Sequence, residues 1–136
     1  MKIGDDMKKV VISGSAKLAD KVEFWKKSFE EKGYEVINYP HYDENIDYDE
    51  KYKKFYTDIE SCDIFFLMNE PKGNIEGYIG ASTFGELTYA VMNNVVRKKN
   101  IKILMLNMPS MILFCYEELV RWIDLGWVKF YNNEDI

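Results

Sequence analysis

The sequence predicts an α/β fold of three layers, in which helices cover a mostly parallel, doubly wound sheet of five strands. Short apolar runs alternate with amphipathic segments along the whole chain, without repeats or low-complexity tracts. The chain has 136 residues, 47% of them hydrophobic, which is enough for one core and too little for two ordinary domains. We therefore expect residues 1–136 to form a single domain.

The first strand and helix follow from residue size and spacing. Val10 to Ile12 is a short apolar run that predicts a buried strand, and Ser13-Gly14-Ser15 supplies the small residues of a tight turn. A helix is expected from about Leu18 to Lys32, before a stop at Gly33. Its apolar positions step by four, three and four and share one face: Leu18, Val22, Trp25 and Phe29.

A second strand and helix are expected next. Tyr34 to Tyr39 predicts a strand, and a polar loop over residues 40–45 precedes a helix from about Tyr48 to Ser61. The core-facing residues of this helix are expected to be Phe55, Ile59 and Tyr52. Its charged residues are expected to face water: Lys51, Lys53, Lys54, Asp58 and Glu60.

The remaining chain predicts three strands and two helices. Asp63 to Met68 is an apolar run typical of a strand covered on both faces, and residues 101–106 and 127–131 predict the last two strands. The helix that carries Glu86 is expected to end at Asn93 or Asn94, and the last helix to span residues 116–124. Five strands joined by right-handed crossovers favour a flavodoxin-like or Rossmann-like sheet, with the flavodoxin-like strand order.

Composition and charge narrow the possible partners. The net charge is −5, and the basic residues are scattered, so nucleic acid is not an expected partner. The acidic N-terminus lacks the apolar stretch of a signal peptide, and the longest apolar segment, residues 101–116, is interrupted by polar residues, so no membrane contact is expected. Cys62 and Cys115 lack partners at metal-ligand spacing. We expect a cytoplasmic protein with buried thiols, no metal and no cofactor.

The strand order predicts where a ligand would bind. Open parallel sheets bind ligands beyond the carboxyl ends of the strands, near the point where the strand order reverses. Ser13-Gly14-Ser15 and the loop from Asn69 to Gly80 should converge at that point. The small residues either bind a phosphate or other anion or serve only the turn. A dinucleotide fingerprint is absent, because Ala16, Lys17 and Leu18 follow instead of further glycines.

Glu86 is the candidate reactive group. It ends the segment Tyr-Ile-Gly-Ala-Ser-Thr-Phe-Gly-Glu and lies just inside a helix. It is either a carboxylate directed at the crevice or an acid in the first helical turn, where the helix dipole favours negative charge. Ser82 and Thr83 are the expected caps, and the buried face should hold Phe84, Leu87, Ala90 and Val91.

The order of these segments resembles the nucleoside 2-deoxyribosyltransferase-like superfamily, which includes the 2′-deoxynucleoside 5′-phosphate N-hydrolases. The resemblance covers roughly residues 9–107 and is strongest to short uncharacterised bacterial members that share the Tyr-Ile-Gly segment. Glu86-Leu87-Thr88-Tyr89-Ala90 matches the family's catalytic glutamate and the residues after it. The resemblance implies that Glu86 attacks or stabilises the anomeric carbon of a nucleoside or nucleotide, without a cofactor.

The resemblance also implies positions for the other site residues. Gly14 and Ser15, with Ser13 before them, would lie beside the sugar or its 5′-phosphate, and Ser82, within the segment that includes Tyr78 and Gly80, near the nucleotide. It further implies a homo-oligomer, a dimer or larger. Tyr42, Tyr48, Tyr52 and Tyr56 would either stack on a base or pack at the rim of the site.

Three positions depart from the family pattern. The acid that helps the base to leave would fall at Phe55, the tyrosine of the first strand is Val11, and the transferases' aspartate is Gly80. Asp58 is the nearest carboxylate to the acid position, and the other candidates for the acid are Asp43, Asp47 and His41. Either one of them acts as the acid in an N-glycosidase or deoxyribosyltransferase, or the chain is a nucleotide-binding or sensing module with reduced catalysis.

Overall fold

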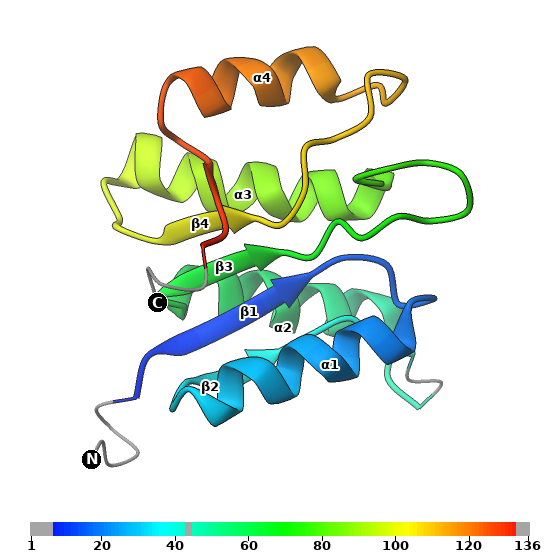
Figure 1. Cartoon of the computed structure of the whole chain (residues 1–136). Helices are drawn as coiled ribbons and strands as arrows, with labels where there is room; N and C mark the ends of the chain where they lie inside the picture. Colours follow the sequence, from blue (N-terminus) through cyan, green and yellow to red (C-terminus); the bar gives the residue numbers. More distant parts are fainter. Residues whose placement is uncertain (1–6, 43–44, 133–136) are drawn as a thin grey trace.

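The strand order predicted from the sequence is confirmed. The computed structural model describes residues 7–42 and 45–132, and within them five parallel strands form one sheet in the order β2-β1-β3-β4-β5 (Figure 1). The strands are β1 Lys9–Ser13, β2 Glu35–Asn38, β3 Ile64–Leu67, β4 Lys102–Met105 and β5 Lys129–Phe130. The order reverses between β1 and β3, which places the predicted crevice at the carboxyl ends of these two strands.

Helices cover both faces of the sheet, as Figure 1 shows. They are α1 Ala19–Glu31, α2 Tyr48–Ser61, α3 Ala81–Arg97 and α4 Tyr116–Asp124. Successive strand residues point to opposite faces, so Val10 and Ile12 pack with α1, whereas Val11 packs in the larger core with α2, α3 and α4. The three layers are therefore formed by α1, the sheet, and the other three helices.

Both ends of α3 differ from the prediction. The helix continues past Asn94 to Arg97, and Lys98 ends it in the left-handed conformation, with φ 60°. The side chain of Asn94 bonds to both the N–H and the C=O of Ile101, so this asparagine joins the helix to β4 instead of ending it. At the other end Gly80 is the N-cap, without a side-chain cap bond. Neither Ser82 nor Thr83 caps the helix.

Close backbone contacts position the loops at the carboxyl edge. A Cβ on Gly14 would lie 2.9 Å from the carbonyl oxygen of Met68, so only glycine lets β1 and β3 end this close together. Asn69 and Asn107 exchange three hydrogen bonds of 2.6 to 3.1 Å, which join the segments after β3 and β4. These contacts fix the start of the loop that leads to α3.

The structure also bears on the cysteines and on the length of the helices. Cys62 and Cys115 are buried free thiols, as predicted. No helix in the described part of the chain has the length and apolar character needed to cross a membrane.

Candidate functional site

The side chain of Glu86 lies next to the carboxyl end of β1. Glu86 is the sixth residue of α3, in its second turn, so the interpretation as a first-turn acid is wrong. Ser13, the last residue of β1, is fully buried, and its hydroxyl donates a hydrogen bond of 2.6 Å to Oε1 of Glu86. A strand and a helix that are distant in sequence thus hold this candidate reactive group between them.

Burial changes the acidity of Glu86. Removal of the carboxylate from water raises the pKa of Glu86 from 4.5 to about 7, while the hydrogen bond from Ser13 and the positive charge of Lys51 act in the opposite direction. Both protonation states are consequently populated near neutral pH. A carboxyl group with such a pKa can serve as a nucleophile or can exchange protons with a ligand.

Glu86 faces a pocket of about 530 Å³ at the carboxyl ends of the strands. The turn after β1 and the loop before α3 both line it, so the predicted convergence of these two segments is present. Sequence-predicted residues that line the pocket are Gly14, Ser15, His41, Tyr78, Gly80, Ser82 and Glu86. Ser13 does not line it, and reaches the site through its bond to Glu86.

Asp58, expected as a catalytic acid, does not line the pocket. Its Oδ2 accepts hydrogen bonds from the Asn38 amide at 2.8 Å and from the Lys54 ammonium at 2.9 Å. Phe55, one turn earlier on α2, lines the pocket instead and is buried. Asp47 is the N-cap of α2 and is likewise not a lining residue, and Asp43 lies outside the described residues.

The sequence analysis missed Lys51 as a site residue. Lys51 was expected to face water, but it lines the pocket and its ammonium donates to the backbone carbonyl of His41. Its spacing of four residues from Phe55 places both on one side of α2, which is the signal that could have identified it. Tyr52 also lines the pocket; its ring lies 4.4 Å from that of Tyr48, whose hydrogen bond, together with burial, raises the pKa of Tyr52.

The charge of the pocket differs in sign from that of the protein. Lys17, Lys51 and Lys72 line it, and Glu86 is the one carboxylate among the lining residues that the structure describes. Lys72 also lies over the ring of Tyr78, with its ammonium 4.7 Å from the ring centre. In a chain of net charge −5, this arrangement favours a ligand that carries negative charge.

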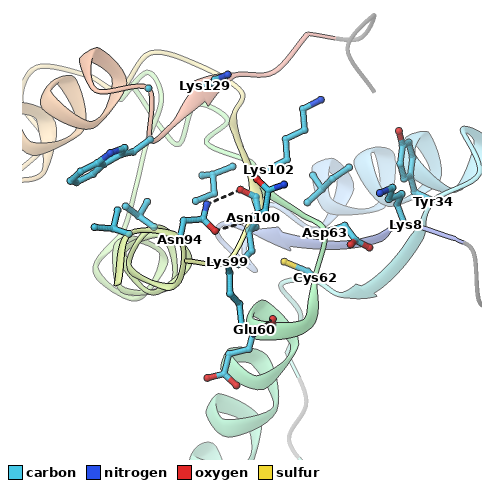
Figure 2. A pocket seen from close by; sticks show the side chains of 17 residues that line it. Lys8, Tyr34, Glu60, Cys62, Asp63, Asn94, Lys99, Asn100, Lys102 and Lys129 are labelled. Atoms are coloured by element: carbon cyan, nitrogen blue, oxygen red, sulfur yellow. Dashed lines mark hydrogen bonds between the residues drawn. The ribbon is translucent and has the colours of Figure 1, made fainter. Parts of the chain in front are cut away.

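A larger hollow of about 920 Å³ lies at the opposite, amino edge of the sheet (Figure 2). Its polar groups are largely engaged: the Lys99 ammonium donates to the carbonyl of Glu60, and Asp63 accepts from the backbone N–H of Lys9. Burial raises the pKa of its thiol, Cys62, to about 12, so this sulfur is not a nucleophile at neutral pH. The smaller pocket is therefore the better candidate for chemistry.

The fold and the pocket together define an α/β protein with a candidate small-molecule site at the carboxyl edge of a parallel sheet. Among solved structures, the chain is similar to the CMP N-glycosidase BcmB of Clostridium botulinum, with a TM-score of 0.59 and 21% identity over 94% of this chain and 92% of that one. This likeness shows a shared fold. No protein-family model matches the sequence, and no curated protein matches it.

Proposed function

We propose that this protein cleaves the N-glycosidic bond of a nucleoside or nucleotide, as an N-glycosidase or a deoxyribosyltransferase. The observation that carries the proposal is the Glu86 carboxyl group, bonded to Ser13 at 2.6 Å and lining a pocket at the carboxyl edge. The glutamate lies in the segment that resembles the superfamily's catalytic one. The fold neighbour, named as a CMP N-glycosidase, supports the same class of reaction.

The proposed reaction uses Glu86 as a nucleophile. Positive charge develops at the anomeric carbon as the base leaves, and an ionised carboxylate below the sugar stabilises that charge. The carboxylate then forms a bond to this carbon, and water or a second base releases the sugar in the next step. Ser13 favours the ionised form of Glu86, because its hydrogen bond to the carboxylate lowers the pKa that burial raises.

A 5′-monophosphate is the substrate form that the charge of the pocket supports best. The three lining lysines would offset a phosphate group, and Gly14 and Ser15 at the turn after β1 offer backbone N–H groups and a hydroxyl. An uncharged nucleoside would leave these cations without a matching group. We therefore expect monophosphates to react with a higher kcat/KM than the corresponding nucleosides.

Incubation with ribo- and deoxyribonucleosides and their 5′-monophosphates tests the proposal, with free base measured by chromatography. Wild-type protein should release base from at least one of them, and Glu86→Gln and Glu86→Ala should abolish the release. Equal release by wild type and Glu86→Ala contradicts the proposal. Addition of a second free base separates the two activities, because only a transferase forms a new nucleoside.

A binding module that does not turn its ligand over is the alternative. It is favoured by Phe55, which lines the pocket at the family's acid position, and by Val11, which is buried in the core at the position of the family's tyrosine. A nucleotide at a hundredfold excess over Kd stabilises a protein by about 2.7 kcal/mol. A nucleotide that raises Tm accordingly and is recovered intact supports the alternative.

The resemblance to the superfamily also implies a homo-oligomer, a dimer or larger. Large apolar side chains are exposed on the segment between β4 and α4, including Met111, Ile112 and Phe114. Light scattering coupled to size-exclusion chromatography measures the subunit number, and a mass of one chain at micromolar concentration contradicts the expectation.

A further inference from the structure

The ring of His41 is held in one orientation at the wall of the pocket. Its Nδ1 lies 2.8 Å from the backbone carbonyl oxygen of Tyr39. A carbonyl oxygen only accepts, so Nδ1 carries a hydrogen and donates it. The remaining nitrogen, Nε2, is therefore the atom that takes up and releases a proton. Within the described residues, no hydrogen bond occupies Nε2.

Lys51 contacts the loop of His41 and also acts electrostatically on the nucleophile. The Lys51 ammonium donates to the carbonyl of His41, and the same ammonium lowers the pKa of Glu86. His41, Lys51 and Glu86 all line the one pocket. The other titratable groups that line the pocket are Lys17, Tyr39, Tyr42, Tyr52, Lys72 and Tyr78.

The other candidates for the leaving-group acid are less suited to that role. Asp58 is bonded to Asn38 and Lys54, and it does not line the pocket. Apart from Glu86, which acts as the nucleophile, the remaining proton donors of the pocket wall are lysines, tyrosines and hydroxyls, whose ordinary pKa values lie far above neutral pH. Only histidine has an ordinary pKa near the pH at which it must donate.

We propose that His41 is the catalytic acid that protonates the departing base. This inference rests on the proposed N-glycosidase function and assigns the role that Phe55 cannot fill. The Nε2–H of the imidazolium passes its proton to a nitrogen or oxygen of the base. At the same time the C1′–N bond breaks, with its electron pair going to the base, and Glu86 forms a C–O bond to C1′.

The second half of the reaction restores both groups. Water attacks C1′, and the bond between C1′ and the Glu86 oxygen breaks, with its electron pair returning to the carboxylate. Neutral His41 takes the proton that the water loses. One water is consumed, and the free base and the sugar phosphate are the products.

The test varies how much protonation the leaving group needs. The base of N7-methylguanosine 5′-monophosphate already carries positive charge and departs without an acid, whereas guanine does not. Uridine and 5-nitrouridine 5′-monophosphates form a second pair, in which the nitro group makes the departing anion stable. Each is supplied in its ribose and 2′-deoxyribose form. The variant His41→Asn keeps a donor at the place of Nδ1 and lacks the acid, and His41→Gln is the second variant.

We expect the His41 variants to lose activity on the ordinary substrates and to keep most of it on the activated ones. Both His41 variants should release the ordinary base 10²- to 10⁴-fold more slowly than wild type, and the activated base less than about 10-fold more slowly. Glu86→Gln should lose activity on all substrates. Equal slowing of both members of a pair by His41→Asn, or no slowing, overturns the role of His41 and leaves the proposed function intact. Absence of release by wild type from all substrates overturns the proposed function, and this inference with it.

Discussion

The hydroxyl of Ser13, at the end of β1, donates a 2.6 Å hydrogen bond to Oε1 of Glu86 on α3. Hydrogen bonds to charged groups contribute about 1.5–3 kcal/mol, and this one favours the ionised carboxylate. Ser13→Ala should therefore raise the pKa of Glu86 further above 7 and move the rising limb of the pH–rate profile to higher pH. Ser61→Ala, which removes a hydroxyl bonded within its own helix, is the control. An unchanged profile contradicts the proposed coupling.

The raised pKa of Glu86 predicts how stability depends on pH. The folded-state pKa of about 7 lies above the reference value of 4.5, so the folded protein binds more protons between these values. Stability is then full below pH 4.5 and falls as the pH rises through 7, by about 3 kcal/mol at about 1.4 kcal/mol per unit. Glu86→Gln should be more stable than wild type at pH 8 and similar at pH 4.5. Urea denaturation of both proteins at pH 8 and pH 4.5 measures this difference. The same difference in free energy of unfolding at the two pH values contradicts the prediction.

Lys51 should matter more for charged ligands than for neutral ones. Loss of a charge-assisted contact to phosphate costs about 1.5–3 kcal/mol, so Lys51→Met should raise KM for a 5′-monophosphate roughly 10- to 100-fold and change KM for the nucleoside little. Lys53→Met removes an exposed charge from the same helix and is the matched control. Equal effects of the two substitutions would place the phosphate elsewhere.

Gly14 should tolerate no side chain. An added Cβ would lie 2.9 Å from the carbonyl oxygen of Met68, and relief of that contact requires the ends of β1 and β3 to move apart. We expect Gly14→Ala to lower the free energy of unfolding by about 1–3 kcal/mol. Gly80→Ala, whose Cβ would meet only side-chain atoms of Tyr78, at 3.4 Å or more, is the control. Equal stability of the two variants in urea contradicts the steric argument.

Asp58 should contribute to stability and not to turnover. Asp58→Ala leaves the Asn38 amide, on a buried residue, without its acceptor, at a cost of about 1–3 kcal/mol. Its kcat should stay within a few-fold of wild type, because Asp58 does not line the pocket. A kcat reduced by 10² or more, with stability retained, would return Asp58 to the role of acid.

The sequence predicted those features that depend on long apolar patterns. The runs Val10–Ile12 and Asp63–Met68 identified the central strands because a strand covered on both faces must be apolar throughout. The topology then placed the turn at Gly14 beside the loop ending at Gly80. Side-chain roles within helices were harder to predict, since Lys51 belongs to a helix rich in charged residues, where its four-residue spacing from Phe55 is the one signal that it shares the pocket side.

The C-terminal end of α3 and the role of Asp58 show a second limit of prediction from the sequence. The helix was expected to end at Asn93 or Asn94, but the Asn94 amide bonds to Ile101 seven residues later, a contact that no local preference encodes. The acid position was inferred by counting along a family pattern, which indicated Asp58 as the nearest carboxylate. Its ion pair with Lys54 is a contact of spacing four within α2, whereas its contact with Asn38 depends on the packing of α2 against β2, which sequence spacing does not describe.

Ser13 and Glu86 are 73 positions apart in the chain, so no local segment contains the site. A refolding chain that has formed only its helices still lacks this bond, because the bond closes a long loop at a cost in chain entropy. Recovery of the ability to turn over a nucleotide should lag behind recovery of helical circular dichroism. The reaction itself would then report when α3 has docked on the sheet.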